Sequence, residues 1–389
     1  MKKIIFPFIF WGEDYANNLS EYCLKTLINE ISFLDKKKFR IDIALWSSKN
    51  DFNIVKKNFK HLSKKFNFIN IELFLNENSL KKLNKYQFLN VIQLLILTKY
   101  KKEYDYMFFL YPDFVLSKNS IVNIFKKIKK FDLMFVYAPQ IIKEEYIKEH
   151  QDVKIKYTTQ KFIYENLHRI VTSNTVNKDN SFNTGACINF KFKDYFILRN
   201  FHLHPICISL KSFSKDLLKP FNISLDEDFV GNLNLNSKKI YIPNSSNDMI
   251  FASLCGLNEI KIPKIRNNSF YKIQNWIQLH AYNNHTYLSK NNFFLENTEH
   301  GKKNKNIKDI DYVENFMLKI YEKINLKSTD LFNKDDYIYL IERKAHLEKN
   351  QNKIKNSIID YHQNKIFNTT FKENKINKRI KYFLKNNIY

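Results

Sequence analysis

One acidic side chain stands at the end of an aromatic segment. Residues 104–117 have the sequence YDYMFFLYPDFVLS, and a short apolar run of this kind is typical of a buried strand. Such a strand would present Asp113 to solvent, with Ser117 placed to cap a following helix. A carboxylate there can hold Mg²⁺ or Mn²⁺ against a diphosphate, although an aspartate after a strand is also a common turn residue.

A second group of polar and aromatic side chains follows the first apolar segment, residues 4–11. It consists of Trp11, Gly12, Glu13, Asp14 and Tyr15. The two aromatic rings can form a platform for a flat base, and the carboxylates can hold ribose hydroxyls. The alternative is a plain strand-to-helix turn in which Asp14 is the N-cap of the next helix.

Two histidine pairs are further candidates. His202 and His204 alternate as they would on one face of a strand. An H-x-H pair can bind a metal, but no third ligand is near in the sequence, so a contact with substrate or phosphate is the commoner role. His280 and His285 form a second, later pair.

The composition narrows the class of protein. The chain has 389 residues, of which 44% are hydrophobic and 16% aromatic, so it can build a large core. Its formal net charge of +25 suits polyanions or an anionic membrane face, but a biased coding composition with a solvated surface is the favoured explanation. With only 5 glycines, the chain has no P-loop and no G-x-G-x-x-G pattern.

Other classes are disfavoured by missing signatures. There is no G-x-S-x-G elbow and no known nucleic-acid-binding motif, so nucleic acid is not an expected partner. The cysteines Cys23, Cys187, Cys207 and Cys255 are scattered and favour a reducing compartment. The N-terminal apolar run is short and contains Pro7, which favours a first strand over a signal peptide. No run reaches the ~18 apolar residues of a membrane-spanning helix.

Alternating strand and helix patterns would position these residues. Short apolar runs occur at 4–11, 39–46, 68–75, 106–110 and 131–137, with helical periodicity between them. This order predicts βαβ units, a largely parallel sheet and helices on both of its faces. Ligands of such sheets bind beyond the carboxyl ends of the strands, where Trp11 and Asp113 are expected.

This order of elements, ending in the YDYMFFLYPDFVLS run, resembles the nucleotide-sugar domain of GT-A-type glycosyltransferases over roughly residues 1–260. Among these, it is most similar to family-2-like enzymes of bacterial surface-glycan assembly. The resemblance implies a GT-A-like, Rossmann-like mixed sheet. Asp113 matches the last acid of the D-x-D motif, whereas Tyr111 replaces the first. The donor would then contact residues at the strand ends and in the first histidine pair, namely Trp11, Gly12, Glu13, Tyr15, Tyr111, Asp113, His202 and His204.

The resemblance also assigns roles to a cluster of three acids. Asp226, Glu227 and Asp228 are similar in place to the acidic element that supplies the base in inverting GT-A enzymes, with Asp228 preferred and Asp226 next. A carboxylate within reach of a sugar hydroxyl can take its proton. The alternative is that the acids begin a helix and interact with its dipole. A late histidine completes the metal site in some of these enzymes, which makes His280 a metal ligand beside Asp113.

We therefore expect a cytoplasmic glycosyltransferase, peripheral on the inner membrane face. It would use a divalent cation to transfer sugar from a nucleotide-sugar donor to a glycan or lipid-linked acceptor in surface polysaccharide assembly. Residues 1–140 would bind the donor, 141–265 would continue the domain on the acceptor side, and 266–389 would form a helical, basic region. The alternative is a non-catalytic GT-A-like protein that binds anionic lipid or nucleic acid through its basic helical tail, residues 371–389.

Overall fold

The structure is a computed structural model. It describes residues 1–35, 37–59, 67–73, 89, 92–93, 96–97, 99–167, 171–172, 187–213, 225, 229–231, 233–236, 238–256, 283–297 and 306–324.

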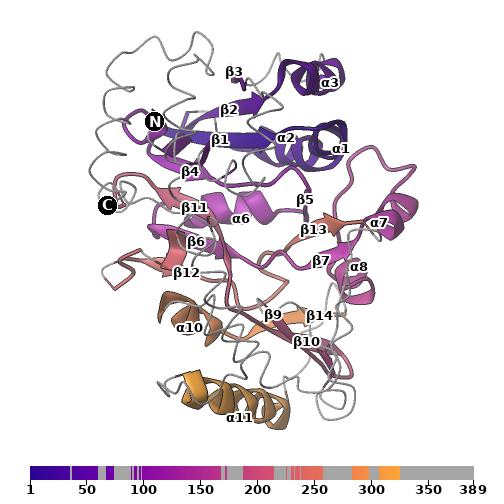
Figure 1. The fold of residues 1–389 in the computed structure, drawn as a ribbon, viewed down its shortest axis with the longest axis vertical. Helices are drawn as coiled ribbons and strands as arrows, with labels where there is room; N and C mark the ends of the chain where they lie inside the picture. The colour runs from indigo at the N-terminus through magenta and orange to yellow at the C-terminus, as the bar shows by residue number, and fades with distance from the viewer. Residues whose placement is uncertain are drawn as a thin grey trace, which may run out of the picture.

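A seven-stranded sheet in the order β12-β6-β11-β4-β1-β2-β3 forms the centre of the fold (Figure 1). Its strands are β1 (Lys2–Phe10), β2 (Phe39–Ser47), β3 (Asn67–Glu72), β4 (Tyr106–Phe108), β6 (Leu133–Val136), β11 (His204–Ser209) and β12 (Ile240–Tyr241). The pairings are parallel except those of β11, which runs antiparallel between β4 and β6. The predicted α/β class and mixed, mostly parallel sheet are therefore confirmed, and the five predicted strands are β1, β2, β3, β4 and β6.

Helices and helical turns pack on this sheet or on the two smaller sheets. They are α1 (Glu13–Asn18), the π-helical turn η1 (Leu19–Cys23), α2 (Leu24–Ser32), α3 (Lys49–Phe59), α6 (Ser120–Lys127), α7 (Lys143–Glu149), α8 (Gln160–Glu165), α10 (Asn283–Ser289) and α11 (Ile307–Ile324). Among the helices that the structure describes, none has both the length and the apolar character needed to cross a bilayer.

The central strand β1 is buried on both faces. Ile4, Phe6 and Phe8 pack in one cluster with side chains of α2 and α6, while Ile5 packs in the other cluster, which contains Ile96. Successive side chains of a strand point to opposite faces, so the continuous apolar sequence of β1 supplies both halves of the core, as expected for a central parallel strand.

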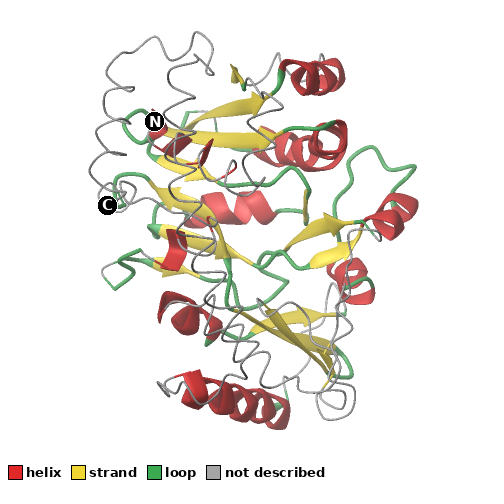
Figure 2. Ribbon diagram, in the orientation of Figure 1, coloured by secondary structure: helices red, strands yellow, loops and turns green. Residues whose placement is uncertain are grey.

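Two smaller sheets extend the molecule. The first has the order β5-β13-β7, with β5 (Phe114–Leu116), β13 (Phe251–Cys255) and β7 (Gln140–Ile142). The second has the order β14-β10-β9-β8, with β14 (Phe293–Glu296), β10 (Tyr195–Asn200), β9 (Cys187–Lys191) and β8 (Val171–Thr172). Figure 2 shows the second sheet below the central one, beside α11.

These sheets join the three regions expected from the sequence. β11 and β12 lie in region 141–265 and belong to the central sheet, while β14 lies in region 266–389 and pairs with β10. Helix α11 forms part of the amphipathic helical region expected for residues 266–389. The basic tail, residues 371–389, lies outside the described residues.

Candidate functional site

The predicted site residues within the described part of the chain lie at the carboxyl edge of the central sheet. Trp11 directly follows β1, and Tyr111 and Asp113 follow β4. Because β11 is antiparallel to its neighbours, its first residue, His204, lies at the same edge. This is the edge at which open α/β sheets bind ligands.

Gly12 shapes the turn after β1. Its φ of 95° lies in a region that favours glycine, and its N–H donates a 2.9 Å hydrogen bond to Oδ2 of Asp51 on α3. The Ser48 hydroxyl donates to the same oxygen over 2.6 Å. The N-cap of α1 is Gly12 and not Asp14, which lies in the first helical turn.

The aromatic side chains of this turn differ in exposure. Trp11 is partly buried against the core, whereas Tyr15 on α1 is 42% exposed. Glu13 is exposed at the start of the same helix. Tyr15 therefore presents aromatic surface to solvent three residues after Gly12.

Asp113 is fixed by strand β13. Its carbonyl oxygen accepts the N–H of Leu254 over 2.9 Å, and its Oδ2 accepts the hydroxyl of Ser253 over 2.6 Å. Asp113 as a residue is partly exposed. Burial, followed by the charge of Asp113, raises the pKa of the Cys23 thiol in η1, which keeps this thiol neutral beside the carboxylate.

Tyr111 takes the position of the expected first acid and packs against rings. Its ring centroid lies 4.8 Å from that of His204 and 5.3 Å from that of Phe114. His204 is buried, and its Nε2 lies 2.7 Å from the carbonyl oxygen of Phe109, to which the Nε2–H tautomer donates. His204 therefore supports the segment that carries Asp113.

His202 does not share a strand face with His204. It lies in a bend before β11, and its ring centroid is 4.6 Å from that of the fully buried His285 on α10. The neighbouring Asn284 donates to the carbonyl oxygens of Val230 and Leu233 over 2.9 and 2.8 Å. α10 thus connects His202 to the chain segment that follows the acidic cluster.

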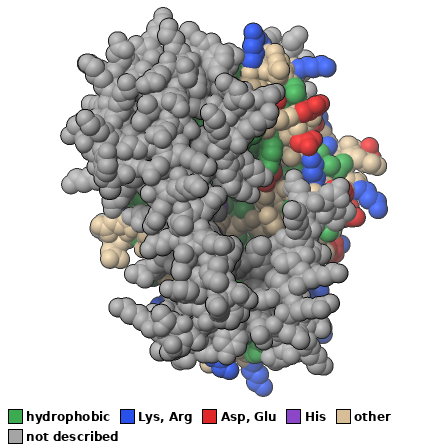
Figure 3. Space-filling view, viewed as in Figure 1, with side chains coloured by type: hydrophobic (Ala, Val, Ile, Leu, Met, Phe, Trp, Pro, Cys, Tyr) green, Lys and Arg blue, Asp and Glu red, His purple; other side chains and the backbone are tan. Residues whose placement is uncertain are grey.

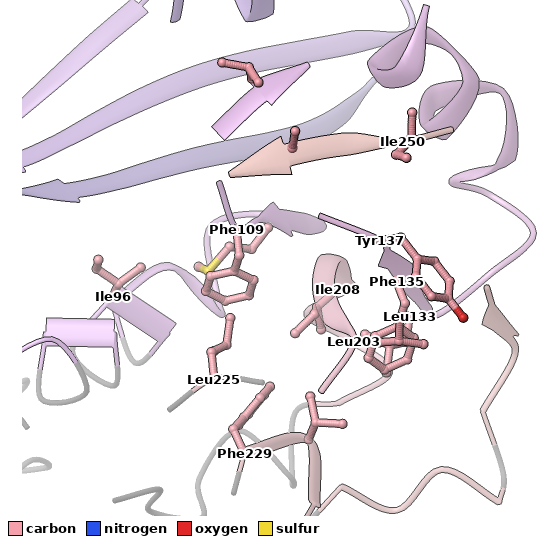
Figure 4. Packing of buried hydrophobic residues seen from close by; sticks show 14 of the residues in the cluster. Ile96, Phe109, Leu133, Phe135, Tyr137, Leu203, Ile208, Leu225, Phe229 and Ile250 are labelled. Atoms are coloured by element: carbon pink, nitrogen blue, oxygen red, sulfur yellow. The ribbon is translucent and has the colours of Figure 1, made fainter. Parts of the chain in front are cut away.

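The acidic cluster itself, Asp226, Glu227 and Asp228, lies outside the described residues, as does His280. The residues on either side of the cluster are described: Leu225 and Phe229 are buried in the same hydrophobic cluster as Phe109. Figure 4 shows Leu225 next to Phe109, with Phe229 beyond it. The two flanks are therefore anchored beneath the segment that leads to Asp113.

The described residues contain no group of three His, Cys, Asp or Glu side chains placed to hold a metal ion. Asp113 is the predicted ligand among them. Mg²⁺ is commonly held by one or two carboxylates together with substrate phosphates, so one carboxylate fits a cation that arrives with a diphosphate.

The residues that orient the site carry no signal in the sequence. Ser253 lies 140 positions from Asp113, and Asp51 lies 39 positions from Gly12. Neither shows a local pattern, because a serine in a strand and an aspartate in a first helical turn are both ordinary. Only the folded sheet brings these pairs together.

Comparison with known proteins gives neither a matching family model nor a matching curated protein. Among solved structures, residues 1–349 of S. aureus TarS align with a TM-score of 0.37 and 13% identity, covering 92% of this chain and 81% of that one. A longer S. aureus TarS chain aligns with a TM-score of 0.36 and 14% identity. The alignment covers 72% of this chain but only 39% of the length of that TarS chain. Mouse xyloside xylosyltransferase 1 aligns with a TM-score of 0.27 and 11% identity, covering 39% of this chain and 59% of that one. These scores are low, and the fold class stated above rests on the strand order.

Proposed function

We propose that this protein is a glycosyltransferase that binds a nucleotide-sugar donor at the carboxyl edge of its central sheet. The observation that carries the proposal is the placement of Asp113, which β13 holds by two hydrogen bonds at the edge where the Gly12 turn also lies. A strand-end carboxylate beside exposed aromatic surface suits a diphosphate joined to a flat base.

In this proposal each group has one task. Trp11 and Tyr15 contact the base, and Glu13 contacts the ribose. Asp113, with His280, would hold Mg²⁺ or Mn²⁺ against the diphosphate, and such an ion supplies charge neutralisation for the leaving group. Tyr111 lies beside Asp113 and contacts the donor through its ring edge.

The acids between Leu225 and Phe229 would serve the acceptor. Asp228, or Asp226, takes the proton of an acceptor hydroxyl while its oxygen forms the bond to the anomeric carbon and the bond from that carbon to the diphosphate oxygen breaks. The burial of both flanks in the hydrophobic cluster that contains Phe109 supports this placement. The acceptor would be a glycan or a lipid-linked glycan of a bacterial surface polysaccharide, in keeping with the resemblance noted in the sequence.

Thermal melting with donors tests the proposal. UDP- and GDP-sugars are added with and without Mn²⁺, and UDP-GlcNAc is included because TarS 1–349 has been solved in complex with it. A donor at about 100 times its Kd should stabilise the protein by about 2.7 kcal/mol. Asp113→Asn should lose most of this gain, because the amide still accepts from Ser253 but no longer carries the charge that holds the cation.

Asp152→Asn is the matched control, since Asp152 is exposed in a turn after α7. It should keep the full stabilisation. If no donor raises the melting temperature of the natural protein, the proposed function is wrong. If Asp113→Asn responds as fully as the control, Asp113 does not hold the diphosphate.

A further inference from the structure

Lysine side chains gather at the opposite, amino edge of the central sheet. They surround an open pocket of about 580 Å³, whose lining includes Lys2, Lys37, Lys38, Lys129, Lys211 and Asp105. We refer to these six residues as the lysine pocket. It is separate from the candidate site, which lies at the other end of the same strands.

The fold assembles the lysine pocket from distant parts of the chain. Lys2 begins β1, Lys37 and Lys38 precede β2, and Lys129 lies in the turn between α6 and β6. Lys211 follows β11, and because that strand is antiparallel its end meets the beginnings of its neighbours. The backbone N–H of Lys2 donates to the carbonyl oxygen of Lys38 over 2.9 Å, which fixes two of these segments together.

The acids nearby do not balance the charge. Asp105 lies 3.5 Å from Nζ of Lys2 and 3.0 Å from Nζ of Lys211. Burial opposes the ionisation of Asp105, but the N–H of Lys3 and these two ammonium groups together hold its pKa below the usual value, so it stays charged. Lys38 lies 3.4 Å from Asp35. The lining holds five lysine ammonium groups and the Asp105 carboxylate, a side-chain charge of 5 − 1 = +4. The pair of Lys38 with Asp35, which is outside the lining, lowers this to 4 − 1 = +3.

One side of the described surface is mixed in charge. Figure 3 shows acidic and basic side chains interspersed along the right-hand side, where α7 lies in Figure 1. The lysine pocket differs from this part of the surface in carrying an excess of positive side chains.

The chemistry of the lining favours lipid headgroups over nucleic acid. The lining described here contains no arginine and no aromatic ring, whereas single-stranded nucleic acid is generally held by rings on which its bases stack. Lysines are flexible, hydrated point charges, and clusters of them suit the diffuse negative charge of anionic bilayers. We propose that the lysine pocket docks the protein on anionic phospholipid headgroups of a membrane surface.

Docking would orient the molecule. β1 has nine residues and is therefore about 30 Å long. A protein seated on its lysine pocket would hold the carboxyl edge about 30 Å from the headgroups and facing away from them. The docking proposal does not depend on a nucleotide-sugar activity.

Vesicle co-sedimentation of the full chain tests the docking proposal. Vesicles of phosphatidylcholine alone are compared with vesicles of phosphatidylcholine and phosphatidylglycerol, over a series of salt concentrations. The pocket variant is Lys37→Gln/Lys38→Gln/Lys129→Gln, which leaves both ion pairs of Asp105 in place. The control variant is Lys118→Gln/Lys148→Gln/Lys154→Gln, at three exposed positions away from the pocket lining. Both variants lower the net charge equally, from +25 to 25 − 3 = +22.

We expect salt-sensitive binding to the phosphatidylglycerol vesicles only. The pocket variant should bind them about a hundredfold more weakly, and the control variant within a few-fold of the natural protein. Equal loss in both variants, full binding by the pocket variant, or no binding to anionic vesicles would each overturn the proposal. So would a pocket variant that loses affinity for a single-stranded oligonucleotide and not for vesicles. Donor-induced melting shifts should be the same in both variants, so the result stands apart from the test of the proposed function.

Discussion

The backbone at Gly12 determines where the first helix begins and how the first strand ends. Gly12 is the N-cap of α1 and has a φ of 95° and a ψ of 144°. A Cβ at this position would have no atom within 4 Å, so space does not oppose a larger residue. The requirement for glycine is conformational.

Gly12→Ala should therefore lower the free energy of unfolding by about 1–3 kcal/mol, the usual cost of holding an L-residue in such a region. Urea denaturation measures the change. Gly256→Ala is the control. Gly256 also lies outside regular structure, but among the described glycines it is Gly12, and not Gly256, that has a positive φ. Equal effects of the two substitutions would show that the turn does not demand glycine.

At this scale the sequence predicts which side chains stand at strand ends, because strand ends follow apolar runs. It therefore indicates Trp11 and Asp113. It does not predict their partners, since the Ser253 hydroxyl and the Asp51 carboxylate arrive through the order of strands in space. Nor does it predict that His202 lies outside β11, in a bend where its ring packs against that of the distant His285.

Among the elements, α6 depends on a side chain from another helix. Its N-cap, Asn119, has a φ of 68° and makes no side-chain capping bond. Glu30 on α2 is buried, and its Oε1 accepts the N–H of Asn119 over 2.9 Å, with the N–H of Val122 at 3.5 Å from Oε2. A carboxylate at a helix N-terminus satisfies free N–H groups and interacts favourably with the helix dipole.

Glu30→Gln should destabilise the protein by about 1–2 kcal/mol, because the amide removes the charge and turns a donor toward the N–H groups. Glu21→Gln is the same substitution in η1, where Glu21 pairs with Lys25 at the surface. It should change stability by less than about 0.5 kcal/mol. Thermal denaturation compares the two. A Glu30 variant as stable as the Glu21 variant would mean that α6 does not use this cap.

The elements themselves differ in how far their sequences predict them. Long runs rich in Ile and Phe predict β1 and β2, since buried parallel strands need such side chains. The sequence predicts a helix cap at Ser117, whereas the cap is Asn119 and the Ser117 hydroxyl lies 2.5 Å from that of Ser120. The short strand β5 was missed because its three residues form a strand only by pairing with β13.

Across the whole molecule, the second sheet and α11 form one packed unit. Ile188, Phe190 and Ile197 pack against α11, and the buried Arg199 pairs with Glu314 while donating to the carbonyl oxygen of Ser289 over 2.9 Å. Tyr195 on β10 adds a hydrogen bond from its hydroxyl to Asp309 over 2.8 Å. These contacts attach the described part of region 266–389 to the rest of the fold.

Several tyrosines in this unit and elsewhere in the fold have a pKa that burial raises. Burial, together with the acceptor Asp309, raises the pKa of Tyr195 to about 12, and burial with the nearby Glu30 raises that of Tyr157 to about 12 as well. Burial likewise raises the pKa of Tyr104 and Tyr146. In the unfolded chain these groups titrate near 10.

The fold should therefore lose stability as the pH rises from about 10 to 12. A phenol is neutral when protonated, so above pH 10 the unfolded chain releases protons that the folded chain retains. Stability is complete below the unfolded pKa and falls as the pH approaches the folded pKa, by up to about 1.4 kcal/mol per pH unit for each such tyrosine. Thermal melting across this range, with tyrosinate absorbance followed in parallel, measures the loss.

The direction in which stability changes above pH 10 distinguishes the effect of tyrosine burial from the effect of net charge. Lysines lose their charge over the same range, which reduces the repulsion within a chain of net charge +25 and would stabilise it. Tyr195→Phe should weaken the alkaline loss, because it removes one buried phenol, whereas Tyr287→Phe at a 58% exposed position should not. A melting temperature that rises above pH 10, or equal pH profiles for the two variants, would mean that charge repulsion and not tyrosine burial controls the alkaline stability of this fold.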